Sequence, residues 1–194
     1  MSGAAQLAVQ APFEQTFFDW FGGLADLQAG CVRFIGDAAT RIAEDHLRIL
    51  RFYRFAARFG DGNLEPVSHA AVTAARQSLK SLSRERIADE LTKILSLPDP
   101  RAIVGQMAAD GIFAVILPEL DPGFAAALDR LLANESATVA APAALRRLAA
   151  LLPADAGIAD QVASRLRLST RQRKHLSAIS AYRHDARPVR QLAH

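Results

Sequence analysis

The chain has 194 residues, of which 51% are hydrophobic and 7% aromatic, and its formal net charge is +3 at pH 7. This length can bury a core as one large or two small domains, and the predominance of Ala and Leu indicates a helical protein. The slight basic excess permits a nucleic-acid partner without requiring one.

The cysteine count and the hydropathy pattern limit the possible compartments. Cys31 is the single cysteine, so an internal disulfide is excluded, and no Cys/His cluster has the spacing of a zinc site. No apolar run approaches the ~20 residues of a membrane span. The N-terminus has no basic segment followed by an apolar stretch, as a secretory signal would. We therefore expect a cytoplasmic protein with no membrane partner.

The N-terminal residues predict a short β-hairpin. Two short segments of strand-forming residues, 7–9 and 16–18, flank the turn-forming segment Ala11-Pro12-Phe13-Glu14. An isolated hairpin is marginal in water, so we expect these strands to be the edge of a larger sheet. Trp20 and Phe21, which follow, are expected to be core wedges, and Gly22-Gly23 then interrupts the chain.

From about residue 38 the sequence predicts helices to its end. Pro66 suits the first turn of a helix that reaches about residue 82, and Asp99-Pro100 and Asp121-Pro122 each place a carboxylate before a proline at a helix start. Ser169 and Gln172 have the spacing of a capping box. Linkers this short make consecutive helices pack on one another. The predicted fold class is all-α, an irregular helical array with a short β remnant at the N-terminus.

Residues 38–59 predict one amphipathic helix, with a buried stripe made of Ile42, Ile49, Phe52, Ala56 and Phe59. A carboxylate and three arginines recur on it at intervals of three residues: Asp45, Arg48, Arg51 and Arg54. Neighbours at this spacing lie about 5–6 Å apart at their Cβ atoms, so two of them can address one ligand. The alternative is a salt-bridged, solvated surface, because an i, i+3 ion pair is ordinary on a helix.

An Asp beside an Arg has a defined recognition chemistry. Cytosine and adenine present an amino donor next to a ring-nitrogen acceptor, whereas guanine and uracil present these groups in the reverse order. A carboxylate that only accepts and a guanidinium that only donates therefore match C and A and oppose G and U. Arg51 and Arg54 could hold phosphate groups.

Residues 19–54 resemble the class II tRNA nucleotidyltransferases, which are the CCA-adding enzymes and their relatives the bacterial poly(A) polymerases. Asp19, Gly22 and Gly23 are similar to the family's hinge between catalytic head and neck. The segment Glu44-Asp45-x-x-Arg48 is similar to its amino-acid template for the incoming CTP or ATP. The resemblance implies that Asp45 and Arg48 select the base and that Arg51 and Arg54 also contact the nucleotide.

The resemblance extends over about residues 15–180. Glu85-Arg86, Glu90 and Lys93 are similar to the neck helix that follows the template, although their charges alone predict surface ion pairs. The implied organisation is a residual head edge and hinge (1–24), a neck (25–98) and a helical body that binds RNA (99–194). A basic cluster in that body, also explicable as a solvated helix end, would contact tRNA phosphates: Arg165, Arg167, Arg171, Arg173 and Lys174.

The sequence departs from the family where the chemistry lies. The resemblance implies a Mg²⁺ cofactor, held by an Asp-x-Asp pair in the head, but this sequence contains no Asp-x-Asp. The single Gly-x-Gly, Gly60-Asp61-Gly62, is explained as a helix-ending turn. We therefore expect a neck and body without catalytic residues or metal ligands. Two alternatives remain, a non-catalytic RNA-binding module that lost its head and a poly(A) polymerase relative.

Overall fold

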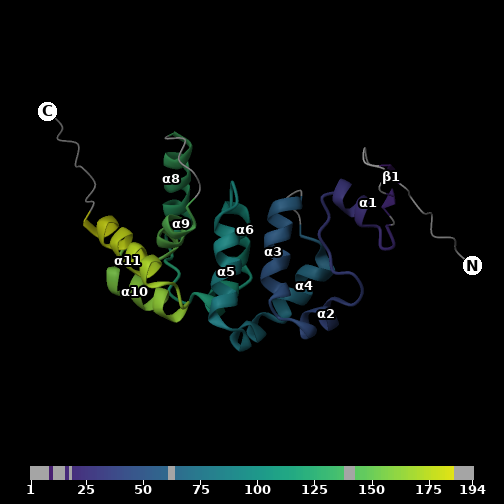
Figure 1. Ribbon diagram of the computed structural model, residues 1–194, viewed down its shortest axis with the longest axis horizontal. Helices are drawn as coiled ribbons and strands as arrows, with labels where there is room; N and C mark the ends of the chain where they lie inside the picture. Colours follow the sequence, from purple (N-terminus) through teal and green to yellow (C-terminus); the bar gives the residue numbers. More distant parts are fainter. Residues whose placement is uncertain (1–8, 11–15, 18, 61–63, 138–142, 186–194) are drawn as a thin grey trace, which may run out of the picture.

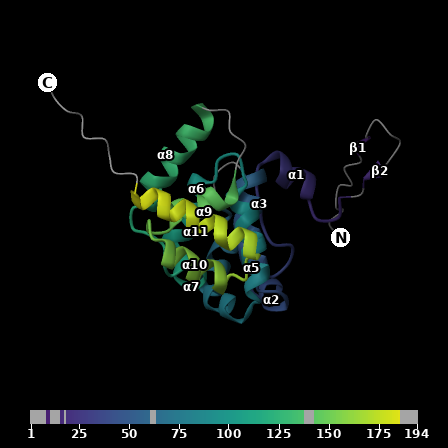
Figure 2. The ribbon, with the colours of Figure 1, turned by 60° about the vertical axis from the view of Figure 1, so that its left-hand side comes forward.

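The computed structural model describes residues 9–10, 16–17, 19–60, 64–137 and 143–185. Helices follow one another across the molecule in chain order, from α1 at one end to α10 and α11 at the other (Figure 1). The two ends of the described chain therefore lie on opposite sides of the array, which the second view also shows (Figure 2). The predicted all-α helical array is confirmed.

The predicted β remnant is also present. β1 (Val9–Gln10) pairs antiparallel with β2 (Thr16–Phe17), with Val9 opposite Phe17. The flanking positions of the predicted strands, 7–8 and 18, lie outside the described residues.

The helices divide into an earlier and a later set. The earlier set is α1 (Gly23–Gln28), α2 (Ala38–Glu44), α3 (Arg48–Phe59), α4 (Pro66–Ala74), the 3-10 helix η1 (Arg76–Ser81) and α5 (Arg84–Leu95). The later set is α6 (Arg101–Ala109), α7 (Ile112–Ile116), α8 (Phe124–Ala137), α9 (Ala144–Leu151), α10 (Ala156–Arg165) and α11 (Thr170–Asp185).

Side-chain caps define several helix starts. The capping box before α11 is confirmed, because Ser169 Oγ accepts from Gln172 N at 3.3 Å and Gln172 Oε1 accepts from Ser169 N at 2.9 Å. Asp99 caps the start of α6, although that helix begins at Arg101, one residue later than predicted. Pro66 does begin α4, but the helix ends at Ala74 and continues as η1, so the prediction of one helix to about residue 82 was wrong.

The prediction of a single helix over 38–59 was wrong as well, because the helix is interrupted at Asp45. This residue is extended, with φ −154° and ψ 104°, and it ends α2. Its carboxylate accepts a hydrogen bond from Leu47 N at 3.1 Å, and its carbonyl accepts one from Arg48 N at 3.0 Å. Asp competes with helix in this way, by offering its side chain to a nearby backbone N–H. Asp45 therefore separates two helices instead of lying on one.

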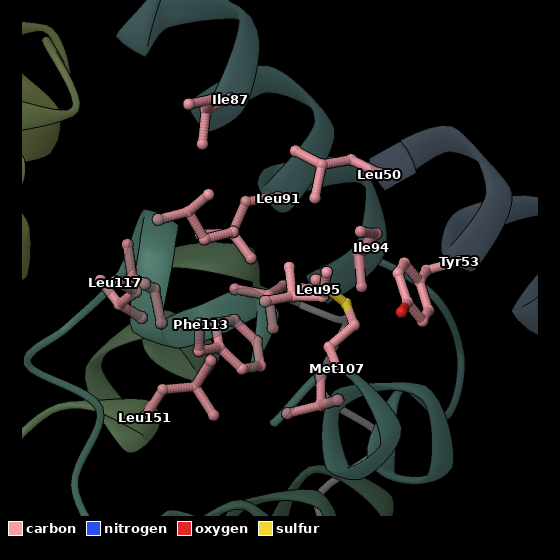
Figure 3. Packing of buried hydrophobic residues seen from close by; sticks show 14 of the residues in the cluster. Leu50, Tyr53, Ile87, Leu91, Ile94, Leu95, Met107, Phe113, Leu117 and Leu151 are labelled. Carbon is pink, nitrogen blue, oxygen red and sulfur yellow. The ribbon is translucent and has the colours of Figure 1, made fainter. Parts of the chain in front are cut away.

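The main core forms where α3 and α5 meet α6, α7 and α9 (Figure 3). Its side chains include Leu50, Tyr53, Leu91, Ile94, Leu95, Met107, Phe113 and Leu151. Four members of the predicted stripe on residues 38–59 are buried, but Phe59 is 45% exposed, since it falls at the last residue of α3. None of the described helices has the length and apolarity needed to cross a membrane.

Trp20 and Phe21 are not core wedges. Their exposed fractions are 75% and 63%, and α1, which follows them, has no buried residue. Among the described residues at this end, α1 therefore provides no buried surface on which the two rings could pack.

Candidate functional site

The predicted hinge residues act together at the start of α1. The Asp19 carboxylate accepts from Gly23 N at 2.7 Å and from Leu24 N at 2.9 Å. Gly22 has φ +77°, a conformation that side-chain-bearing residues seldom adopt. The hydrogen bond from Leu24 is the largest of the influences that lower the pKa of Asp19. The Asp-x-x-Gly-Gly segment is thus a tight turn with its own charged cap.

A basic pocket of about 280 Å³ lies between residues 32–35, α2 and α3. Its walls are Val32, Arg33, Phe34, Ile35, Arg41, Arg48, Arg51, Phe52 and Phe55. The Phe34 and Phe52 rings stack with their centroids 5.8 Å apart. Four guanidinium groups beside aromatic rings can hold an anionic ligand that also carries a flat ring.

Two of the four predicted nucleotide-contacting residues, Arg48 and Arg51, line this pocket. Arg48 Nη1 donates to Glu44 Oε2 at 2.6 Å and to the Arg41 carbonyl at 2.7 Å. That hydrogen bond from Arg48 is the largest influence on Glu44 and lowers its pKa. Glu44 and the Arg41 carbonyl therefore fix the direction of the Arg48 side chain.

Asp45 is not a wall of the pocket, and its ion-pair partner is Arg86 of α5. Arg86 Nη2 lies 3.0 Å from Oδ1 and 2.9 Å from Oδ2. Partial burial opposes ionisation and is the largest single influence on Asp45, but the hydrogen bond from Leu47 N–H and the Arg86 charge outweigh it and lower the pKa. The structure thus pairs Asp45 with Arg86 and Arg48 with Glu44, and not Asp45 with Arg48.

Arg51 and Arg54 meet at a carboxylate from another helix. Arg54 Nε lies 2.8 Å from Glu90 Oε2 on α5, and Arg51 Nε lies 3.7 Å from Glu90 Oε1. Lys93 Nζ is 3.4 Å from the same Oε1. The side chain of Glu90 is only 1% exposed, so its prediction as part of a surface ion pair was wrong. One buried carboxylate is shared by three cations.

The sequence interpretation missed several residues of this site. Arg33 and Arg41 line the pocket, and Arg33 also binds Asp26 at 2.8 Å. Arg86 and Glu90 are one helical turn apart, so they share the face of α5 that meets α3. That i, i+4 spacing was the available signal, but it did not indicate which partners the two side chains would reach.

The predicted RNA-binding cluster is largely engaged in ion pairs. Arg165 binds Glu119, Arg173 binds Asp160, and Arg167 Nη1 lies 2.7 Å from Glu85 Oε1. Within the described part of the chain no ion pair is found for Arg171 or Lys174. The net charge that this cluster could offer to phosphates is therefore smaller than its composition indicates.

Magnesium needs several oxygen ligands held close together. Across the described ranges no group of three or more His, Cys, Asp or Glu side chains is arranged to hold a metal ion. The described residues therefore do not fit a Mg²⁺ site.

Comparison with known families gives a match over residues 63–124 to a model described as "Probable RNA and SrmB- binding site of polymerase A". The human mitochondrial CCA tRNA nucleotidyltransferase 1 is 46% identical over 85 residues, which are 43% of this chain and 20% of that protein. The multifunctional CCA protein of Halorhodospira halophila is 39% identical over 110 residues, 55% of this chain and 26% of the relative. Poly(A) polymerase I of Haemophilus influenzae is 34% identical over 113 residues, 58% of this chain and 25% of the relative.

Solved structures share the fold. A CCA-adding enzyme in complex with ATP matches 82% of this chain and 40% of its own, with a TM-score of 0.66 and 24% identity. The Thermotoga maritima CCA-adding enzyme bound to tRNA matches with the same four values. At this identity the likeness establishes the arrangement of helices alone.

The matched segment spans only about a quarter or less of the curated relatives. The solved structures match the helical arrangement over 82% of the chain. Over part of its length the chain is therefore similar to CCA-adding tRNA nucleotidyltransferases and to a bacterial poly(A) polymerase.

Proposed function

We propose that this chain selects CTP and ATP for a tRNA nucleotidyltransferase that adds CCA to tRNA 3′ ends, and that it carries the RNA during that reaction. The supporting observation is the pocket in which four arginines lie beside aromatic rings. Arginine forks onto phosphate oxygens and stacks on flat rings, so such a pocket suits a nucleotide. The names of the curated relatives agree with this assignment.

Base selection falls to Arg48 and Asp45. Arg48 uses Nη1 for its two fixed partners, and among the described residues no partner is found for its Nη2 and Nε donors, which can therefore address a ring nitrogen. Asp45 Oδ1 accepts from both Leu47 N and Arg86, whereas Oδ2 accepts from Arg86 alone. A carboxylate oxygen can accept two hydrogen bonds, so Oδ2 retains room for the amino group of cytosine or adenine. Asp45 then acts from the edge of the pocket.

The proposed domain organisation follows the sequence prediction. Residues 1–24 form the head edge and hinge, 25–98 the neck, and 99–194 the RNA-binding body. In the complete enzyme the carboxylates that hold Mg²⁺ belong to the catalytic head, and this chain contributes nucleotide and RNA binding. We place the reaction in the cytoplasm, although the animal relatives carry mitochondrial names.

A poly(A) polymerase is the second candidate, because the Haemophilus influenzae relative bears that name. Both activities use the same template pair, and they differ in the RNA end that is extended. Repeated AMP addition to non-tRNA ends by the complete enzyme would favour this candidate.

The test is the affinity of the full chain for the four ribonucleoside triphosphates, measured by calorimetry. We expect CTP and ATP to bind more tightly than GTP and UTP by about 10-fold, since a well-placed pair of polar contacts discriminates bases by ~1–3 kcal/mol. Arg48→Ala should abolish this preference. Arg33→Ala, in the same pocket, should weaken all four nucleotides equally, and Arg130→Ala on α8 should change none. Equal affinities for all four in the unmodified chain would contradict the proposal.

A further inference from the structure

A second basic hollow lies on another flank of α3, between the C-terminal halves of α3 and α5. Its volume is about 830 Å³, and we call it the α3–α5 hollow. Its walls are Arg54, Ala57, Arg58, Thr92, Lys93, Ser96, Leu97, Pro98 and Asp99. It has no wall residue in common with the basic pocket that Arg48 and Arg51 line.

Positive charge exceeds negative charge in this hollow. Arg54, Lys93 and Arg51 all form ion pairs with Glu90, so one carboxylate is shared by three cations. Asp89, 2.6 Å from Lys93 Nζ, supplies one further negative charge. Arg58 is exposed and has no carboxylate partner among the described residues, and its guanidinium lies over the Phe59 ring, 5.2 Å from the centroid.

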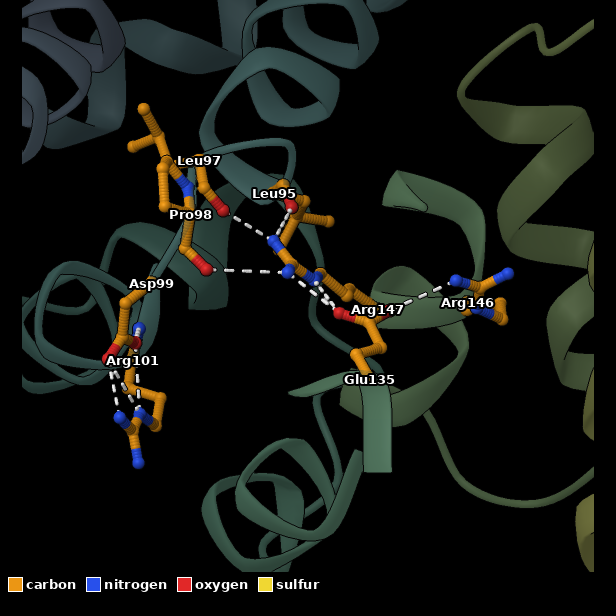
Figure 4. A network of polar contacts seen from close by, with 8 residues as sticks. All are labelled: Leu95, Leu97, Pro98, Asp99, Arg101, Glu135, Arg146 and Arg147. Atoms are coloured by element: carbon orange, nitrogen blue, oxygen red, sulfur yellow. Dashed lines mark hydrogen bonds and ion pairs between the residues drawn. The ribbon is translucent and has the colours of Figure 1, made fainter. Parts of the chain in front are cut away.

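The opposite wall would ordinarily repel an anion, because the last carbonyls of a helix carry partial negative charge. Here the carbonyls of Leu95, Leu97 and Pro98 turn toward a buried guanidinium (Figure 4). Arg147 Nη1 donates to Leu95 O at 2.7 Å and to Leu97 O at 2.5 Å. Arg147 Nη2 donates to Pro98 O at 3.4 Å.

Asp99 is the one carboxylate in the wall, and it too is engaged. Arg101 Nε lies 2.9 Å from Asp99 Oδ1 and Nη2 lies 2.5 Å from Oδ2. The carbonyls and the carboxylate that would oppose an anion are therefore engaged by Arg147 and Arg101. The donors that remain for an anion are those of Arg58 and the third N–H of Lys93, whose other two donate to Asp89 and Glu90.

We propose that the α3–α5 hollow binds phosphate, as part of an RNA backbone that passes between α3 and α5. The inference rests on the proposed function, because RNA is the partner which that function supplies. The volume of the hollow, about 830 Å³, exceeds what one phosphate group requires, so it has room for part of a strand. The α5 wall also lies within residues 63–124, the segment that matches the RNA-binding family model.

The test compares two double variants of the full chain. Arg58→Ala/Lys93→Ala removes two charges from the hollow, and Arg130→Ala/Lys80→Ala removes the same two residue types from exposed positions on α8 and η1. The probe is a fluorescein-labelled single-stranded polyadenylate, titrated at several salt concentrations. Thermal melting of both variants checks that each is folded.

We expect the hollow variant to lose about 10-fold in RNA affinity at low salt, because it loses contacts to phosphate groups. Each lost contact should also reduce the slope of log affinity against log salt concentration by about 0.7 for a single strand. The control variant should change the affinity less than about twofold. Equal losses in the two variants would overturn the proposal, since net charge alone would explain them.

CTP binding to the same proteins distinguishes the two sources of phosphate. If CTP affinity falls in the hollow variant while RNA affinity is unchanged, the hollow holds a nucleotide triphosphate and the RNA assignment is wrong. The two proposals fail separately, because Arg48→Ala addresses base preference and should leave polyadenylate affinity in place, whereas Arg58→Ala/Lys93→Ala should leave the ranking of the four nucleotides intact.

Discussion

Glu90 and Arg147 are both almost completely buried charged side chains, yet their surroundings differ. Glu90 belongs to α5, and Arg147 of α9 contacts the C-terminal end of that helix. Arg147 is 2% exposed and uses all five of its N–H donors, two on Glu135 Oε2 and three on carbonyls at the end of α5. Glu90 is approached by three cations, but Arg54 Nε, Arg51 Nε and Glu90 Oε2 all lack a hydrogen bond of acceptable geometry.

A structural charge and a charge that serves a binding site differ in how much of their hydrogen-bonding capacity is already used. A buried ion pair whose hydrogen-bonding capacity is used up has nothing left for a ligand, and it fixes helices instead. Arg147 on α9 and Glu135 on α8 thereby tie these helices to the C-terminal end of α5. A buried carboxylate with surplus cations around it leaves donors available. Glu90 stands between the two basic hollows, one lined by Arg51 and the other by Arg54.

The largest effect should come from Arg147→Met. The substitution keeps much of the volume but leaves the buried Glu135 carboxylate without its main partner and three carbonyls without a donor. We expect a loss of about 3–5 kcal/mol in the free energy of unfolding, as for other broken buried pairs. Urea denaturation at pH 7 measures it.

Arg146→Met is the matched control. Arg146 is the neighbouring residue and also contacts Glu135, at 3.3 Å, but its side chain is 39% exposed, against 2% for Arg147, so we expect a loss of no more than about 1 kcal/mol. The double variant Arg147→Met/Glu135→Leu removes both buried charges and should regain part of the loss. Similar values for Arg146→Met and Arg147→Met would contradict the view of Arg147 as a saturated structural tie.

Glu90→Gln should have an intermediate effect of a different kind. The amide cannot neutralise Arg51, Arg54 and Lys93, so these cations repel one another, and we expect a loss of about 1–3 kcal/mol. Arg51 and Lys93 reach solvent, so added salt should screen the repulsion and reduce the loss. Urea denaturation at low and high NaCl concentrations measures this dependence.

The salt dependence is what separates the two centres. The loss caused by Arg147→Met should be nearly independent of salt, because both partners are buried. If Glu90→Gln showed the same insensitivity, the surplus charge inferred around Glu90 would not exist, and the comparison between the two centres would fail.

The fold class and the site were predictable from the sequence to different extents. Capping residues such as Ser169 and Asp99 act within three residues, so local pattern located those helix starts to within one residue. The break at Asp45 was missed because apolar spacing continues across it, while the competing hydrogen bond to Leu47 N decides the backbone.

Partnerships across the fold could not be read from spacing. Asp45 and Arg48 are three residues apart, yet Asp45 pairs with Arg86, which is 41 positions away. Glu90 was predicted to be a surface charge because Glu seldom lies in a core unless it is paired. Arg51 and Arg54, which pair with it, lie on α3, so its sequence neighbours did not indicate that it would be buried. The sequence predicted that Arg48, Arg51 and Arg54 lie on one helix. The packing of α3 against α5 determines that Arg51 and Arg54 meet Glu90.

The smallest effect should come from an exposed pair, Glu44 with Arg48, which tests whether burial is the variable that matters. A carboxyl whose pKa is lowered on folding stabilises the fold above its unfolded value of about 4.5, and this contribution is lost as the pH falls through the lower folded value. Glu44→Gln should therefore lower the melting temperature slightly at pH 7 and not at all once Glu44 is protonated in both states. Circular dichroism melts of the variant and the unmodified chain between neutral and acidic pH measure the difference, and high salt should shrink it at neutral pH. A difference that persists unchanged in acid would mean that Arg48 is held by the shape of the side chain at position 44 and not by its charge.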